Sequence, residues 1–325
     1  MKVKLLQKLL LIAGLSLVIG FQIQGQTLND AIEAYHAGID LIETDIKAAI
    51  ESLERSHEMA TQLGEAGEEV KEQAEIQLPG LYFDMAMGHY REREIGQSIA
   101  GFEETIKVSE KYDDPNTKQR AENVLHQLYA IQANAEFRET NNEEALRLFD
   151  KALEINPQHA RSHLGKGLVY RRMEDTENFK KSMDMAIETG LTTEEEQIAE
   201  TAESTARDYF LVRAARAQGN EDFEHAVELL TTSLEYDQSF PETHFLLASA
   251  YNEQSRYQDA VNSAQRAIEL SDGSSEDTAK IYFELGQAYE GLGDTTQACD
   301  AYSNAAYGNY EASANYQMEH VLKCP

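Results

Sequence analysis

Small residues recur along the chain, and other core-type positions follow them at fixed intervals. The first set is Ala86, Ala133, Gly167, Ala214, Ala248 and Gly286, separated by 47, 34, 47, 34 and 38 residues. Twelve residues later come Ser98, Ala145, Phe179, Ala226, Ala260 and Ala298, and four beyond those come Phe102, Phe149, Met183, Leu230, Ala264 and Tyr302. Positions three or four residues apart share one helix face. The pattern predicts stacked helical hairpins with a basic period of about 34 residues.

Seven hairpins and a final helix account for the chain after its first 25 residues. The expected hairpins cover 28–62, 79–112, 126–159, 160–193, 207–240, 241–274 and 279–312, and a cap covers 313–325. A single hairpin cannot bury its apolar faces alone, so its neighbours must complete the core. No stretch has the composition of a flexible linker. We therefore expect residues 26–325 to form one continuous solenoid.

The longer separations of 47 residues contain extra segments at 67–77 and 194–207. Both segments are rich in Glu, Ala and Gln, which favour helix, so they are expected to lengthen the first helix of a hairpin. A third long helix is expected from about Asn116. The pattern from Thr192 to Glu195 predicts a capping box at the start of one such helix.

The recurring residues resemble the tetratricopeptide repeat signature. One repeat carries Tyr129, Ala133, Ala145, Phe149, Ala152 and Pro157, another carries Leu247, Ala248, Tyr251, Ala260 and Ala267, and the last carries Tyr282, Leu285, Gly286, Tyr289, Ala298, Tyr302 and Ala305. The resemblance implies an all-α fold, a right-handed α-α superhelical solenoid. It also implies a non-catalytic scaffold that binds a protein or peptide partner in a concave groove.

In the resembled family the first helix of each hairpin lines the groove. Carried onto this sequence, the groove residues are Phe83, Met87, Tyr90, Asn134, Phe137, Leu164, Leu168, Arg171, Arg172, Leu211, Phe245, Asn252 and Phe283. They would form an apolar strip with scattered amides. The alternative is that they pack against adjoining helices. If they bind a partner, replacing Phe245 and Phe283 by alanine is expected to weaken partner capture without unfolding the array.

Charge narrows the range of partners. The chain has 28 Lys and Arg against 58 Asp and Glu. Three of these lysines lie in residues 1–25 and are lost if that segment is removed. Such an acidic surface repels nucleic acid. Against this background Arg161, Lys166, Arg171 and Arg172, with Arg213 and Arg216, form a basic cluster. It would either hold an acidic group of a partner or neutralise nearby acids such as Glu136, Glu139 and Asp175.

The first 25 residues differ from the rest of the chain. Lys2, Lys4 and Lys8 precede 13 uncharged, mainly apolar residues, 9–21, and a polar exit follows with Gly25. This order is typical of a secretory signal peptide, and the apolar run is short for a membrane span. We expect export to a periplasmic or extracellular location, with no membrane span in the mature chain. No cysteine lies near the cleavage point, so a lipoprotein is not expected.

The two cysteines of the chain, Cys299 and Cys324, lie near its C-terminal end. An even count in an oxidising compartment favours a bridge. Two antiparallel helices that meet beyond the Gly308–Asn309 turn would place the two cysteines at similar heights along the helix pair. The alternative is a pair of unpaired buried thiols.

The sequence contains little that suggests catalysis. It has no phosphate-binding glycine loop, no H-E-x-x-H and no C-x-x-C. His159 and His163 have a metal-compatible spacing but lack a third ligand nearby. The acids Glu194, Glu195 and Glu196 lack the alternation of a calcium loop. We therefore expect no catalytic residues, no metal and no cofactor.

The function expected from the sequence is an exported scaffold or adaptor that binds a protein or peptide. The alternative is a soluble glycan-binding or polymer-binding component of a cell-envelope uptake system, and the absence of Trp weighs against it. A hydrolase with a dispersed active site is a third, weaker hypothesis. The oligomeric state is left open.

Overall fold

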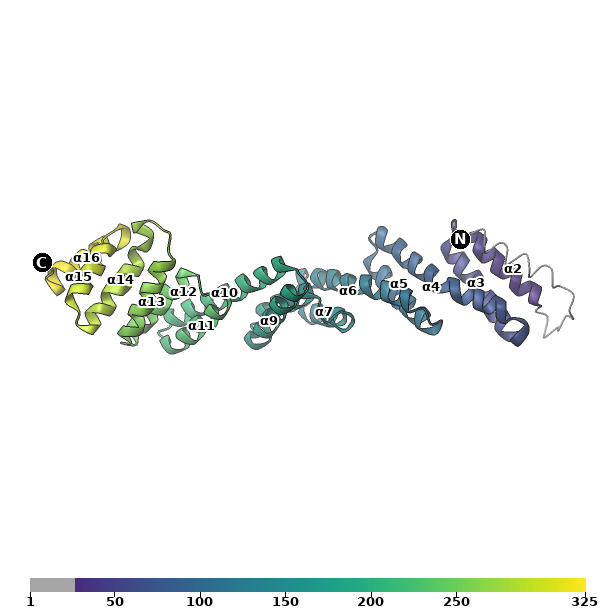
Figure 1. The fold of residues 1–325 in the computed structure, drawn as a ribbon, viewed down its shortest axis with the longest axis horizontal. Helices are drawn as coiled ribbons and strands as arrows, with labels where there is room; N and C mark the ends of the chain where they lie inside the picture. Colours follow the sequence, from purple (N-terminus) through teal and green to yellow (C-terminus); the bar gives the residue numbers. More distant parts are fainter. Residues whose placement is uncertain (1–26) are drawn as a thin grey trace. The chain divides into compact units, whose positions relative to one another are not determined.

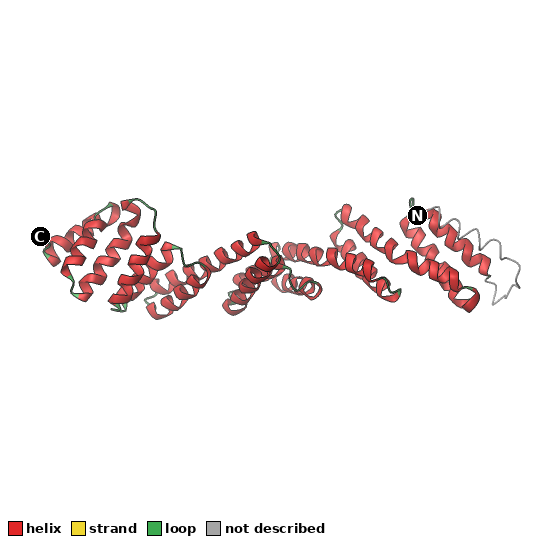
Figure 2. Cartoon of the chain, in the orientation of Figure 1, coloured by secondary structure: helices red, strands yellow, loops and turns green. Residues whose placement is uncertain are grey.

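The structure, a computed structural model, describes residues 27–325, and within this range it contains helices and loops but no strand (Figures 1 and 2). The helices fall into two compact units, one ending at Pro157 and the other starting at Gln158. The first unit contains α2 (Leu28–Leu41), α3 (Ile46–Gln62), α4 (Glu68–Arg91), α5 (Ile95–Lys111), α6 (Pro115–Arg138) and α7 (Asn142–Ile155), with the short 3-10 turn η1 (Gly64–Ala66) after α3.

The second unit contains α8 (Ala160–Arg172), α9 (Thr176–Thr192), α10 (Glu196–Gly219), α11 (Phe223–Tyr236), α12 (Pro241–Glu253), α13 (Tyr257–Leu270), α14 (Ser275–Leu292) and α15 (Thr295–Ala305). It ends with η2 (Gly308–Tyr310), α16 (Glu311–Tyr316) and η3 (Gln317–Leu322), the last of which winds as a π-helix. Consecutive helices pack as pairs from α2–α3 to α14–α15. The all-α class and the hairpins are confirmed. The expected final helix is also present, although it starts earlier and changes its winding.

One turn recurs between the two helices of almost every hairpin. A residue with positive φ follows the first helix at Arg93, Thr140, Glu174, Glu221, Ser255 and Gly293. The next residue donates its backbone N–H to the carbonyl five residues back, as Glu94 does to His89 and Asp175 does to Tyr170. This is a Schellman turn, which closes the first helix and satisfies its last carbonyl groups. In three of these hairpins the residue that follows is an aspartate that caps the second helix, as Asp175 does through the N–H of Asn178.

The lengthened first helices are confirmed. Helices α4, α6 and α10 each contain 24 residues. The same type of turn precedes two of them, because Asp113 and Glu194 also have positive φ. The connection is therefore tight, and the extra residues become helix.

The expected capping box at Thr192 is wrong. Thr192 lies inside α9, and its hydroxyl donates to the carbonyl of Glu188. Helix α10 begins after Glu195, whose side chain makes no capping hydrogen bond. The Schellman turn at Glu194 allows α9 to continue to Thr192, whereas a cap made by the Thr192 side chain would have required α9 to end sooner.

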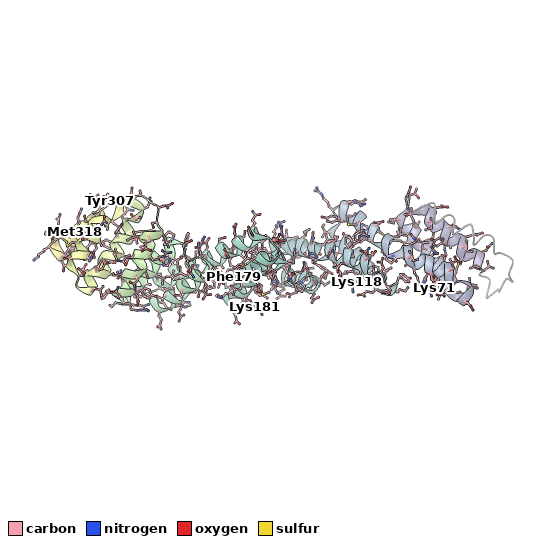
Figure 3. All side chains as sticks on the ribbon, viewed as in Figure 1. Lys71, Lys118, Phe179, Lys181, Tyr307 and Met318 are labelled. Atoms are coloured by element: carbon pink, nitrogen blue, oxygen red, sulfur yellow. A yellow bond between two sulfur atoms is a disulfide. The ribbon has the colours of Figure 1, made fainter. Side chains whose placement is uncertain are left out.

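Small residues bring paired helices together, and large side chains fill the remaining space. A Cβ on Gly101 would lie 2.8 Å from the Cβ of Ala86, which shows how closely α5 approaches α4. In the second unit Phe179, which is labelled in Figure 3, is fully buried. It lies in one apolar cluster with Met183, Phe210 and Leu230. Its ring centroid is 4.1 Å from that of Tyr209. Within each unit the core therefore lies in the interfaces between successive helices.

The expected signal peptide, residues 1–25, lies outside the described residues. Among residues 27–325, no helix has the length and apolar character that crossing a membrane requires. The single continuous solenoid remains a prediction, and each compact unit is described by itself.

Candidate partner-binding face

The first helices α8 and α10 of the second unit contact each other. Leu164, Leu168 and Leu211 are partly buried, and all three pack against the cluster around Phe179. Arg171 follows Leu168 by three residues and Ala215 follows Leu211 by four, so each shares a helix face with its leucine. Both Arg171 and Ala215 are exposed. We call these five residues the α8–α10 face.

The basic cluster predicted in this region has mixed surroundings. Arg171, Arg172 and Arg216 are exposed, whereas Arg161 lies 3.8 Å from Glu195. The guanidinium of Arg213 stacks on the ring of Tyr209 at 5.3 Å and donates to its hydroxyl.

Neutralisation accounts for part of this cluster only. Asp175, one of the acids expected to neutralise it, accepts hydrogen bonds from Asn178 as the cap of α9. The guanidinium of Arg171 makes no ion pair with any side chain among residues 27–325. The exposed guanidinium of Arg171 is therefore accessible on the surface of α8.

The predicted groove residues of α12 and α14 are used mainly for packing. Phe245 packs against the cluster of α13 and α14, and the ammonium of Lys280 lies 4.5 Å from its ring centroid. Phe283 is held between Tyr302 and Tyr310, with both centroids at 5.4 Å. The double alanine substitution would therefore remove packing contacts as well, and the role of these residues in binding stays a prediction.

A buried carboxyl group links the same two helices. The side-chain amide of Asn252 donates to the backbone carbonyl and to the carboxylate of Glu284, both at 2.9 Å. Burial raises the pKa of Glu284, while hydrogen bonds from Asn252 and Ser249 oppose the shift. The side chain of Asn252 thus links α12 to α14 through hydrogen bonds in this structure.

In the first unit the predicted residues of α4 and α6 differ in exposure. Phe83 is buried, and the guanidinium of Arg120 covers its ring at 4.1 Å. Met87 and Phe137 are partly buried, whereas Tyr90 is exposed. Asn134 donates to the carbonyl of Ala130 within α6. Only part of the predicted strip is therefore exposed here.

Cavities in the described residues are lined by other side chains. One, of about 530 Å³, is lined by Phe240, Pro241, Glu242, Ser271, Asp272, Gly273, Glu276, Asp277, Thr278, Lys280, Ile281, Asn309 and Tyr310. The other, of about 360 Å³, is lined by Glu54, His57, Glu58, Thr61, Gln62, Lys111 and Tyr112. Neither is lined by a predicted groove residue.

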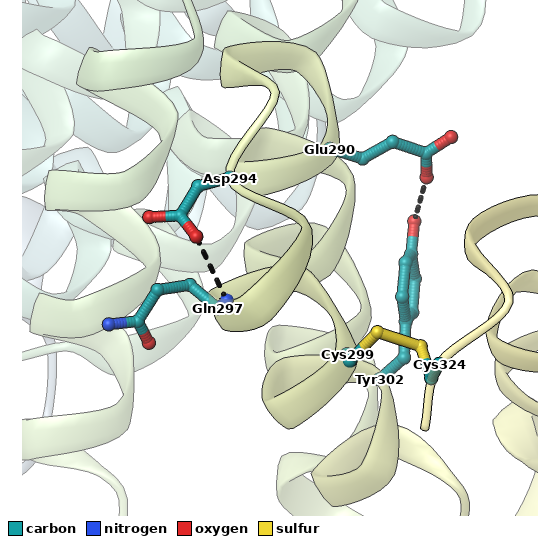
Figure 4. The surroundings of a disulfide bond; sticks show 6 residues. All are labelled: Glu290, Asp294, Gln297, Cys299, Tyr302 and Cys324. Atoms are coloured by element: carbon teal, nitrogen blue, oxygen red, sulfur yellow. Dashed lines mark hydrogen bonds between the residues drawn. A yellow bond between two sulfur atoms is a disulfide. The ribbon is translucent and has the colours of Figure 1, made fainter.

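The predicted disulfide is present between Cys299 and Cys324, whose Cα atoms are 5.8 Å apart (Figure 4). It joins α15 to the residue that follows η3 by two positions. Beside it the hydroxyl of Tyr302 donates to Glu290 at 2.8 Å. The two cysteines therefore do not act as thiol nucleophiles while the bond is formed.

The candidate metal-binding residues have structural partners. His159 Nδ1 lies 2.7 Å from the hydroxyl of Ser162 at the start of α8. Glu195 precedes α10 and pairs with Arg161, and Glu196 lies in the first turn of α10, where an acid complements the helix dipole. Within residues 27–325, no group of three or more His, Cys, Asp or Glu side chains is arranged to hold a metal ion.

Sequence reasoning missed the cations that cover the aromatic groove positions. Lys280 occupies the second position of its repeat, three residues before Phe283, and could have been found by carrying the family's second position onto the chain. Arg120 lies in the added part of α6, outside the repeat frame. No sequence signal identified it as the cover of Phe83.

A family model described as tetratricopeptide repeat matches residues 132–178, 211–275 and 253–314. The resemblance is therefore supported over these segments, which include α8 and most of the second unit. The fold and this match are those of helical-repeat proteins, whose stacked repeats form extended binding surfaces. No curated protein matches the chain.

Solved structures with helical repeats are similar to parts of the chain. YrrB, described as a TPR protein with an unusual peptide-binding site, is 20% identical, with 60% of this chain and 88% of that chain covered and a TM-score of 0.33. MamA from Desulfovibrio magneticus RS-1 is 16% identical, with 58% and 96% covered and a TM-score of 0.33. PilW, described as a type IV pilus biogenesis factor, is 18% identical, with 74% and 99% covered and a TM-score of 0.30.

Proposed function

We propose that this protein is an exported, non-catalytic scaffold that binds a protein or peptide partner along its first helices. The observation that carries the proposal is the α8–α10 face. There, partly exposed leucines lie beside the exposed Arg171 in a chain with a formal net charge of −30. Apolar side chains would supply affinity, and the guanidinium would fix the position of a partner carboxylate through paired hydrogen bonds. The comparisons give no support to the glycan-binding alternative.

Site-specific photo-crosslinking in cells tests the binding face. A photoreactive amino acid at Arg171 or Ala215 is expected to capture the same partner. The same residue at Lys181 or Arg266, exposed positions on the second helices α9 and α13, should capture none. A segment of the captured partner should then bind the Arg171→Glu variant about tenfold more weakly, because a charge-assisted contact is lost.

The Arg266→Glu variant makes the same charge change away from this face and should bind normally. Equal crosslinking from both sets of positions, or equal loss of affinity in both charge variants, would remove the α8–α10 face as the binding site.

Export is tested through the oxidation state of Cys299 and Cys324. Disulfides persist in oxidising compartments and are rare in the cytosol. Alkylation of thiols in intact cells should leave the full-length chain unmodified and should label both cysteines in a chain that lacks residues 1–25. Labelling of the full-length chain as complete as that of the chain without residues 1–25 would contradict export, because even a reducible bond is mostly oxidised in an oxidising compartment.

A further inference from the structure

The segment after α15 folds back over the end of the second unit. Ala314 is fully buried, and Met318 and Leu322 pack against the cluster of Ala298, Tyr302 and Ala305. On the other side η2 contacts α14, where Tyr310 packs against Phe283. The segment therefore covers apolar side chains that a further hairpin would cover in a longer array.

This cover is thin. Helix α16 has only 6 residues before the winding changes to the π form for another 6, and helices this short are marginal without outside support. Several of its large side chains point away from the core, since Tyr307, Tyr316 and Val321 are 47, 58 and 46% exposed. The segment also supplies Asn309 and Tyr310 to the wall of the 530 Å³ cavity. Its attachment therefore affects both the apolar end of the unit and this cavity.

The disulfide holds the far end of the segment. Cys324 lies 25 residues beyond Cys299 in sequence, and the bond returns it to α15. Both cysteines are partly exposed and not part of the fully buried core. We propose that Cys299–Cys324 is a redox-controlled latch and that residues 306–325 are a lid over the end of the second unit.

The reductant is a dithiol, either a small molecule or a thioredoxin-like protein. One thiolate attacks a sulfur of the bond, forms a mixed disulfide and releases the other cysteine as a thiolate, which takes up a proton. The second thiol of the reductant then displaces the protein sulfur and leaves as part of an oxidised disulfide. Two electrons pass to the protein, and Cys299 and Cys324 end as thiols. The lid then separates, which uncovers Phe283 and Tyr302 and opens one wall of the cavity.

Hydrogen exchange on the full-length protein tests the latch. Reduction with dithiothreitol, or the substitutions Cys299→Ser and Cys324→Ser together, should speed exchange over residues 308–325 by roughly 100-fold, because a loop constraint is removed. Exchange in α15 should rise less, and α12 and α13 should be unchanged. The Tyr316→Ala variant, which alters an exposed side chain and keeps the bond, should retain the slow exchange.

Dithiothreitol should have no further effect on the variant without cysteines, which separates bond cleavage from other effects of the reagent. Unchanged exchange over residues 308–325 after reduction would overturn the proposal. An equal acceleration from α8 to α15 would overturn it as well, because the bond would then be a general staple of the unit.

Discussion

Phe179→Ala is expected to destabilise the second unit by about 3–5 kcal/mol, the usual range when a fully buried phenylalanine is truncated. The repeat pattern alone predicts otherwise, because Ala145, Ala226 and Ala260 occupy the equivalent position in other hairpins. In this hairpin, however, Phe179 is fully buried and packs against Tyr209 and Phe210 from the next hairpin. An alanine would leave a cavity between α9 and α10.

Urea unfolding followed by circular dichroism measures this loss, and hydrogen exchange locates it. Exchange should accelerate most in α8–α11, since helical repeats depend on their nearest neighbours. Leu191→Ala provides the control on the same helix, because Leu191 is 58% exposed and its truncation should cost little. A Phe179→Ala variant as stable as the original protein would show that the repeat pattern, and not the packing seen here, sets the tolerance of this position.

The sequence predicted the hairpins well because their cause is local and repeated. Small residues at a fixed spacing permit close contact between paired helices. The recurrence of Ala133, Gly167, Ala214 and Ala248 therefore predicts the stacked hairpins. The turns were harder to predict. Positive φ falls on Arg93, Glu174 and Ser255, which carry no glycine signal, so their backbone conformation follows from the two helices that they join.

The candidate site was predicted less well for a different reason. The family pattern identifies which positions face the first-helix side, but it does not say what covers them. Phe83 lies under Arg120 and Phe245 under Lys280, and each cation comes from the next first helix. Whether a groove position is exposed therefore depends on the side chains of the next first helix, as well as on its own helix. Among the predicted groove residues, Arg171 and Arg172 on α8 and Tyr90 on α4 are exposed.

Alkaline pH is expected to destabilise the second unit steeply, because two of its tyrosines donate to carboxylates. Tyr236 donates to Asp184 at 2.7 Å, and Tyr302 donates to Glu290 at 2.8 Å. Burial is the main cause that raises the pKa of each hydroxyl, and the hydrogen bond to the carboxylate raises it further. In the unfolded chain both hydroxyls titrate near their usual pKa of about 10.

The sign of the effect follows from proton binding. Below about pH 10 both states keep the phenolic protons, so the stabilisation is fully present. Above that value the unfolded chain loses them while the folded unit retains them, and folding then requires proton uptake. Each tyrosine contributes at most about 1.4 kcal/mol per pH unit, and the partly exposed Tyr236 contributes less because solvent screens its pair, so the free energy of unfolding should fall by up to about 3 kcal/mol per pH unit from these two residues.

Urea titrations on either side of about pH 10 measure this slope, and the Tyr236→Phe and Tyr302→Phe variants isolate its source. Each variant should lose about half of the two-tyrosine contribution, although Tyr302→Phe will also cost about 1–3 kcal/mol at neutral pH because Glu290 loses its donor. Deprotonation of lysines is common to all three proteins and cancels in the comparison. A variant that combines both substitutions provides the final test. If its free energy of unfolding falls with pH as steeply as that of the original protein, the loss of stability comes from general repulsion in this acidic chain and not from the tyrosine–carboxylate pairs.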